Sequence, residues 1–102
     1  MEKFGLIGRL IAVPGKRDEL AALLLDAAAA AESFDGCELY AVHVADDDPD
    51  GVWVTEVWRD AAAHQASLQL ESTKAMIARG RALIAGFGES RKLRTLGGKG
   101  LS

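Results

Sequence analysis

The chain has 102 residues, and its 49% hydrophobic and 26% charged side chains are the proportions of a single globular domain spanning residues 1–102. This composition excludes an intrinsically disordered chain and a membrane-spanning one. The net charge of −3 provides no positive field to attract nucleic acid or an anionic membrane surface, so we expect neither as a partner.

The N-terminal residues 1–7 lack the basic region, the apolar stretch and the cleavage site of a secretory signal. Cys37 is the only cysteine, which excludes an internal disulfide. Both features favour a reducing compartment, and we expect a cytoplasmic protein. Because Cys37 has no basic neighbour in the sequence that would activate it, we expect an inert thiol.

Residues 4–13 are predicted to form the first strand, because they are rich in Leu, Ile and Val and end at the turn pair Pro14-Gly15. The next segment, residues 20–34, has the period of an amphipathic helix. Its apolar positions are Leu20, Leu23, Leu24, Ala27, Ala28, Ala31 and Phe34. Gly36 is predicted to end this helix.

Residues 37–45 and 52–59 are predicted to form a hairpin of two further strands. The loop between them, residues 46–51, consists of aspartates, a proline and a glycine, which favour turns. These aspartates lack the spacing and the final glutamate of a twelve-residue calcium loop, so we assign no metal site there.

The strand at residues 52–59 alternates between two faces that are both partly apolar. One face takes Val52, Val54, Glu56 and Trp58, and the other takes Trp53, Thr55, Val57 and Arg59. Apolar residues on both faces indicate a sheet that is covered on both sides. We expect the chain's own helices on one side and a second copy of the chain on the other.

Asp60 is a good N-cap for the next helix, residues 61–68, which contains His64. A break is predicted at residues 71–73, followed by a second helical run that ends at Gly86 and Gly88. The residues of this run that lie near one face are Met76, Gly80, Leu83, Ile84 and Phe87.

Residues 89–96 are predicted to form the last strand, and residues 97–102 form a glycine-rich tail that is flexible or crosses a dimer. The strand contains Arg91, Lys92 and Arg94. We interpret these basic residues as marking a solvated edge strand that resists unwanted pairing, rather than as a nucleic-acid site.

The predicted order is strand, helix, strand, strand, helix pair, strand, or βαββαβ. This order predicts the ferredoxin-like α+β fold, an antiparallel four-stranded sheet with helices on one face. The other face would expose too large an apolar patch for a monomer. Its apolar residues are Ile7, Ile11, Leu39, Trp53 and Val57, or else the alternating set. We therefore expect a homodimer of two stacked sheets, and whether dimers associate further stays open.

Several short motifs follow one another along the chain. They are Gly8-Arg9-Leu10 before Pro14-Gly15-Lys16, Gly36-Cys37 with Tyr40, and Glu56-Val57-Trp58 followed by Asp60-Ala61-Ala62-Ala63-His64 and Ser67. On these residues, and over nearly its whole length, the chain resembles the antibiotic biosynthesis monooxygenase family. These are dimeric α+β barrel proteins that include small quinol monooxygenases. The Glu-x-Trp followed by an alanine-rich helix with a histidine is the most specific of the motifs.

The resemblance implies a ligand pocket in each subunit, between sheet and helices, where O2 oxidises an electron-rich aromatic substrate without a metal, flavin or other cofactor. We therefore expect a cofactor-independent monooxygenase of a quinol or a related aromatic or polyphenolic small molecule. Three alternatives stay open: a non-catalytic dimeric module that binds a small aromatic ligand, a haem-binding or haem-degrading relative, and a structural assembly protein. Haem-degrading members rely on an asparagine, and this chain contains no Asn.

Ground-state O2 reacts slowly with closed-shell organic molecules, so an enzyme without a cofactor has to deprotonate its substrate to make it an electron donor. A buried base and a dry aromatic site are therefore required. His64 is the first candidate base, because an imidazole titrates near neutrality. Glu56 is the candidate that orients the imidazole or acts as an alternative base. Trp58 is the third candidate catalytic residue, as a ring that packs against the substrate.

Four further residues are assigned to substrate binding: Tyr40, Arg9, Leu68 and Met76. A Tyr hydroxyl or an Arg guanidinium suits a developing oxyanion, whereas Leu68 and Met76 offer apolar contacts. No residue is assigned to a metal.

Each candidate also has a structural alternative. His64 could be an exposed or satisfied helical histidine, and Trp58, Trp53 and Met76 could serve packing alone. Glu56 on a covered strand needs a partner, and an ion pair would supply one. The possible partners in such a pair are Arg9, Lys3 and His43.

Overall fold

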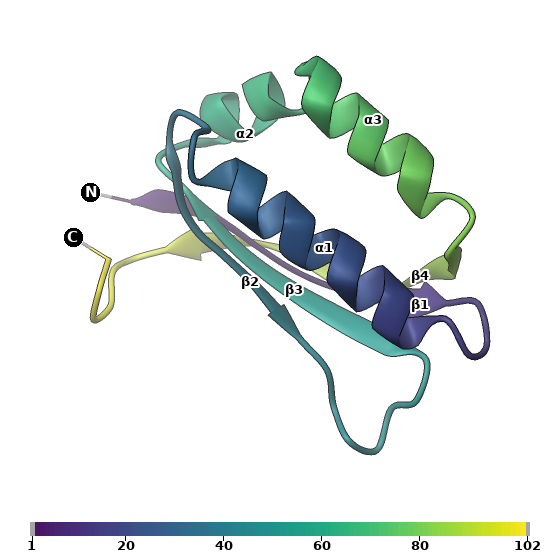
Figure 1. Cartoon of the computed structure of the whole chain (residues 1–102). Helices are drawn as coiled ribbons and strands as arrows, with labels where there is room; N and C mark the ends of the chain where they lie inside the picture. The colour runs from purple at the N-terminus through teal and green to yellow at the C-terminus, as the bar shows by residue number, and fades with distance from the viewer. Residues whose placement is uncertain (1, 102) are drawn as a thin grey trace.

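The computed structural model describes residues 2–101. Within them, four strands and three helices follow one another along the chain (Figure 1). They are β1 (Lys3–Ala12), α1 (Arg17–Ala31), β2 (Cys37–His43), β3 (Gly51–Trp58), α2 (Ala61–Ser67), α3 (Glu71–Gly80) and β4 (Ile84–Thr95). This order confirms the predicted βαββαβ arrangement, with the second helical segment split into α2 and α3.

The strands form one antiparallel sheet in the order β2-β3-β1-β4, so β1 and β3 are its central strands. The helices lie on one face of this sheet, and no element within the described residues covers the other face (Figure 1). The strand order and the layers confirm the ferredoxin-like α+β fold. No helix within residues 2–101 is long and apolar enough to span a membrane.

The strand register determines which side chains face the helices. In β3, Val52, Val54 and Trp58 are buried on the helix-covered face, where Val52 packs with Leu20 and Ala12. Burial of these apolar side chains provides the main stabilisation of the fold, at about 25 cal/mol per Å² of apolar surface.

The uncovered face of the sheet is apolar at its centre. The register places Ile7, Ile11, Leu39, Trp53 and Val57 there, on three neighbouring strands. Leu93 of β4 joins them, paired with Gly5 of β1. The first of the two sets predicted for the exposed face is therefore the one that lies there.

Local signals explain how the helices begin and end. The Asp60 carboxylate accepts a 2.8 Å hydrogen bond from the Ala63 amide, which confirms the predicted N-cap of α2. Helix α1 ends at Ala31, before its predicted end at Phe34. The turn that follows contains Gly36 at φ +82°, where an added Cβ would lie 2.6 Å from the Cβ of Ala63. Only glycine fits this approach to α2.

The boundary between α3 and β4 differs from the sequence-based prediction. Residues 71–73, predicted as a break, form the first turn of α3, and β4 begins at Ile84 instead of residue 89. Ile84 pairs with Ala12 of β1, and Phe87 pairs with Leu10. Pairing with a central strand therefore overrides the helical spacing of these apolar residues.

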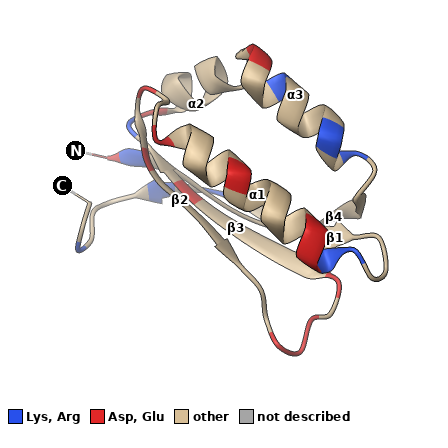
Figure 2. Ribbon diagram, viewed as in Figure 1, with Lys and Arg blue, Asp and Glu red and all other residues tan. Residues whose placement is uncertain are grey.

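Charged residues occur along the helices, in the loops and on the strands (Figure 2). The acidic loop between β2 and β3 extends away from the helices (Figure 2). Strand β4 is an edge strand, as predicted, and its Arg91, Lys92 and Arg94 are exposed.

Candidate active site

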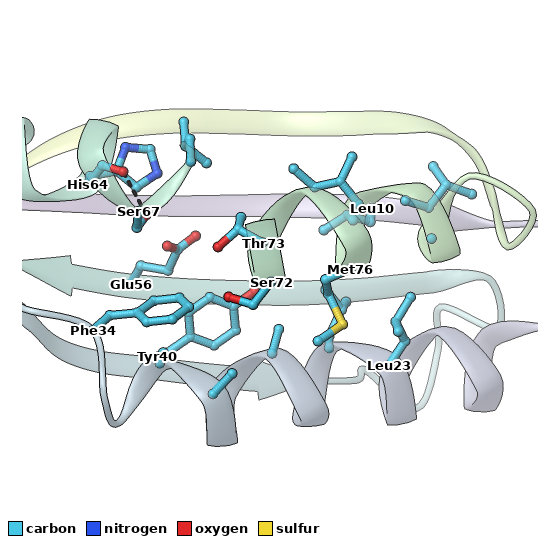
Figure 3. A pocket seen from close by; sticks show the side chains of 18 of the residues that line it. Leu10, Leu23, Phe34, Tyr40, Glu56, His64, Ser67, Ser72, Thr73 and Met76 are labelled. Carbon is cyan, nitrogen blue, oxygen red and sulfur yellow. Dashed lines mark hydrogen bonds between the residues drawn. The ribbon is translucent and has the colours of Figure 1, made fainter. Parts of the chain in front are cut away.

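A cavity of about 570 Å³ lies between the sheet and the helices. Every strand and helix contributes at least one side chain to its wall, and Figure 3 shows most of the lining side chains from close by. The wall is mostly apolar, whereas Glu56, His64 and Thr73 bring polar groups together at one end (Figure 3). An apolar cavity with a few convergent polar groups is the usual form of a small-molecule site.

Glu56 and Trp58 are held together within β3. They lie on the same face of the strand, and the Trp58 indole Nε1 donates a 3.0 Å hydrogen bond to Glu56 Oε1. The ion pair proposed from the sequence for Glu56 is wrong, because each candidate partner bonds elsewhere. Lys3 pairs with Glu38 and His43 contacts the Thr55 hydroxyl, while Arg9 pairs with Asp48.

The Glu56 carboxyl is half-buried in this apolar wall. Burial raises the pKa of Glu56 above its usual value, while the Trp58 N–H and the nearby positive charge of a protonated His64 act in the opposite direction. A carboxyl with a raised pKa exchanges protons closer to neutral pH than an exposed glutamate does.

His64 projects from α2 toward the same end of the cavity (Figure 3). Its ring packs against two aromatic rings, with centroids 5.4 Å from Phe4 and 5.5 Å from Trp58, the latter edge-on. Among the described residues, no protein group forms a hydrogen bond with the imidazole. The ring is thus fixed by packing, and its nitrogens are available to a ligand.

Tyr40 faces Glu56 across the β2–β3 pair and lines the cavity. Burial, together with the negative charges of Glu56 and Cys37 when ionised, raises the pKa of Tyr40 far above its usual value. The phenol therefore stays protonated over the physiological range, which suits it to donate a hydrogen bond to an oxyanion and makes it a poor base.

Two hydroxyl groups near this end of the cavity differ in their partners. Ser67 Oγ donates a 2.6 Å hydrogen bond to the His64 carbonyl oxygen, so α2 itself satisfies it. Thr73 Oγ1 is buried and has no hydrogen-bond partner within the described structure. A buried hydroxyl without a partner costs stability, and a ligand in the cavity could satisfy it.

No role was predicted for Thr73 from the sequence. Its signal is the spacing on α3, where Thr73, Met76, Ile77 and Gly80 all line the cavity at helical steps. Placing a break at residues 71–73 hid this spacing.

The structure brings most of the candidate residues together. His64, Glu56, Trp58, Tyr40, Leu68 and Met76 all line the cavity. Trp58 is 2% exposed, so it forms part of the wall and positions Glu56 rather than offering a wide ring face. Trp53 lies on the opposite face of β3 and does not reach this cavity.

Arg9 is the exception among the candidates. It pairs with Trp53 in the register, on the uncovered face of the sheet. Its guanidinium forms a bidentate ion pair with Asp48, with distances of 2.8 Å and 2.7 Å. The expectation that Arg9 lines the pocket is therefore not met, because the sheet separates its side chain from the cavity.

The site combines a carboxyl, an imidazole and a neutral phenol inside an apolar wall. It can exchange a proton with a phenolic ligand and stabilise the resulting negative charge. Within residues 2–101, no three His, Cys, Asp or Glu side chains come together as a metal site would require.

Comparison with known proteins gives a consistent result. A sequence model of the family described as antibiotic biosynthesis monooxygenase matches residues 4–79. A candidate antibiotic biosynthesis monooxygenase from Chloroflexus aurantiacus is 43% identical in sequence, with a TM-score of 0.89 over 98% of this chain and 99% of that one. No curated protein matches the chain at a significant level.

More distant structures share the same fold. A protein from Pseudomonas aeruginosa is 25% identical, with a TM-score of 0.83 over 94% of this chain and 96% of that one. A candidate antibiotic biosynthesis monooxygenase from Caulobacter crescentus is 22% identical, with a TM-score of 0.84 over 92% of this chain and 90% of that one.

Proposed function

The chain belongs to the antibiotic biosynthesis monooxygenase family, and we propose that it is a cofactor-independent monooxygenase that oxidises a quinol or a related phenol with O2. Family membership supports a general monooxygenase-like role. The substrate class and the use of O2 are our proposal. The observation that supports it most is the meeting of His64, Glu56 and Tyr40 at one end of an apolar cavity.

His64 acts in this proposal as the base that removes a phenolic proton. Its imidazole lies at the polar end of the cavity and has no protein hydrogen-bond partner among the described residues. Loss of the proton makes the bound ring electron-rich, and such an anion transfers an electron to O2 far more readily than the neutral phenol does. Once a ligand fills this mostly apolar cavity, little water remains around its ring to stabilise the anion.

Glu56 stabilises the imidazolium that forms. The two opposite charges attract each other, and a protonated His64 acts to lower the pKa of Glu56. The hydrogen bond from Trp58 Nε1 holds the carboxylate and favours its ionised form. Tyr40, which stays protonated, donates a hydrogen bond to the substrate oxyanion.

The overall reaction balances without an external reductant. A quinol and O2 give a hydroxylated quinone and water, so that one oxygen atom enters the ring and the other leaves as water. All four electrons that reduce O2 come from the substrate: two from the quinol and two from the ring C–H bond that becomes C–OH.

We also propose that the protein is a homodimer formed through the uncovered face of the sheet. The apolar side chains of Ile7, Ile11, Leu39, Trp53 and Val57 gather on this face, where Leu39 is 38% exposed. Apolar side chains gathered on a face that no helix covers support an interface with a second copy. Stacking of two identical sheets would bury it, and the ligand cavity on the other face would stay separate in each subunit.

The test of this function is oxygen consumption with a panel of hydroquinones and anthrones, each incubated with and without the protein in air and under nitrogen. Faster oxygen uptake with protein, and product formation only in air, is the expected result. Tight binding of the same compounds with no oxygen uptake would instead identify a non-catalytic binding module.

A further inference from the structure

We infer that the ligand of this cavity is amphipathic: a phenolic head that binds at the polar end, with a hydrocarbon substituent that extends along the apolar end. This inference depends on the proposed function only in assuming that the ligand is turned over. The binding of such a ligand can be measured without turnover.

The cavity is divided along its length. Glu56, Tyr40, His64 and Thr73 lie at one end, while Leu10 and Leu23 lie toward the other (Figure 3). Leu6 is the β1 partner of Glu56, and Leu10 lies four residues further along the same strand. At about 3.3 Å per residue, the apolar wall therefore extends about 13 Å beyond the level of Glu56.

The size of the cavity exceeds what one ring needs. A cavity of about 150 Å³ is enough to bind benzene, whereas this one measures about 570 Å³. A simple quinol held at the polar end would leave most of the space empty. A ligand that fills the cavity therefore carries a substituent in addition to its phenolic ring.

The chemistry of the far wall indicates what that part is. The residues lining it are mostly branched aliphatic ones, including Leu10, Leu20, Leu23, Leu24 and Ile84. Apart from Glu56 and His64, the lining side chain that bears a charge is Arg81, which is exposed. A sugar, phosphate or carboxylate on the distal part would find no buried polar partner among the lining residues, so a hydrocarbon fits best.

Two apolar side chains at this end are exposed to solvent. Phe87 is 74% exposed and Ile77 is 48% exposed, although both line the cavity. A hydrocarbon chain that leaves the cavity here would cover them and gain their apolar contact.

The polar end of the cavity has a hydroxyl group that is free to bind the phenolic head of the ligand. Thr73 Oγ1 is buried without a partner and lies across the cavity from Glu56 (Figure 3). A phenolic hydroxyl bound at this end could bond to the Thr73 hydroxyl. Thr73 is therefore a substrate-positioning residue in this arrangement.

The test is calorimetric titration under nitrogen with hydroquinones that differ only in the length of one alkyl substituent, from methyl to octyl. Each methylene buried in the cavity is expected to lower Kd by roughly twofold to fourfold, until the chain reaches solvent. An affinity that does not change with chain length, or that falls, overturns the inference.

Variants locate the two ends of the ligand. Phe87→Ser and Ile77→Ser are expected to reduce the gain per methylene, and Leu25→Ser, an exposed α1 position outside the cavity, is the matched control that leaves the gain unchanged. Thr73→Val is expected to weaken every member of the series by the same factor. A loss of affinity with Phe87→Ser that is equal for methyl and octyl compounds would contradict the assignment of the apolar end.

The readouts separate this inference from the proposed function. A Kd that depends on chain length, without oxygen uptake in air, would support the amphipathic ligand and contradict the monooxygenase function. Oxygen uptake with no chain-length dependence of Kd would support the monooxygenase and overturn the amphipathic ligand.

Discussion

The indole N–H of Trp58 donates a 3.0 Å hydrogen bond to the carboxyl of Glu56, two residues away on the same face of β3. This bond joins a wall residue to an ionisable group of the cavity. Burial in the apolar wall raises the pKa of this carboxyl, and the hydrogen bond from Trp58 opposes that effect in part. The properties of the site depend on this pair and on His64. The imidazole ring of His64 packs edge-on against the indole of Trp58.

Replacement of His64 tests the proposed base. His64→Ala is expected to lower kcat for quinol oxidation by about 100-fold or more, the usual contribution of a positioned general base. Initial rates in an oxygen electrode measure the effect, and circular dichroism checks that the fold is retained. The control is His43→Gln, an exposed residue on the other face of the sheet. Unchanged rates in both His64→Ala and Glu56→Ala would contradict the proposed proton transfer.

Trp58 is expected to act on catalysis through Glu56. Because its hydrogen bond lowers the pKa of Glu56, Trp58→Phe should raise that pKa. If the ionised carboxylate is needed, the acidic limb of the kcat against pH profile moves to higher pH. Trp53→Phe on the opposite face is the matched control and should not shift the acidic limb of the kcat against pH profile. A uniform drop in rate without a shift would show that Trp58 serves packing alone.

Glu56 should also affect how stability depends on pH. A carboxyl whose pKa is raised by folding stabilises the folded state below its unfolded pKa, near 4.5, and this contribution is lost as the pH rises through the folded value. Glu56→Gln removes the effect and leaves an acceptor for Trp58. Relative to the wild type, its free energy of unfolding in urea should therefore rise between about pH 4 and about pH 7. A difference that is constant over this range, as expected for the exposed control Glu32→Gln, would contradict the shift.

The uncovered sheet face predicts the oligomeric state. Light scattering after size exclusion should give twice the chain mass of 10.8 kDa. Ile7→Glu, at the centre of the face, should give monomers, because a charge buried between two apolar sheets has no partner there. Leu25→Glu on α1 is the exposed control. A wild type that stays monomeric at high concentration would refute the stacked dimer.

Much of the fold could be predicted from local patterns. The changes of period at Pro14-Gly15, Gly36 and Asp60 mark the ends of elements, and these signals operate within a few residues. The start of β4 could not be placed in the same way. Ile84 and Phe87 have helical spacing, and only pairing with the distant β1 makes them part of a strand.

The site was predictable where it depended on one strand. Alternation alone put Glu56 and Trp58 on one face, and the structure joins them by a hydrogen bond. Arg9 was misplaced because alternation groups it with Ile7 and Ile11 but does not say which face of the sheet the helices cover. Thr73 was missed because residues 71–73 were predicted as a break, which hid its helical spacing with Met76, Ile77 and Gly80.

Isotope labelling tests the central claim most directly. The purified protein would oxidise its best quinol under 18O2, and mass spectrometry would follow the label. The proposed reaction predicts one 18O atom in the hydroxylated quinone and the other in water. A product without 18O, formed together with one equivalent of hydrogen peroxide, would show an oxidase and contradict the monooxygenase.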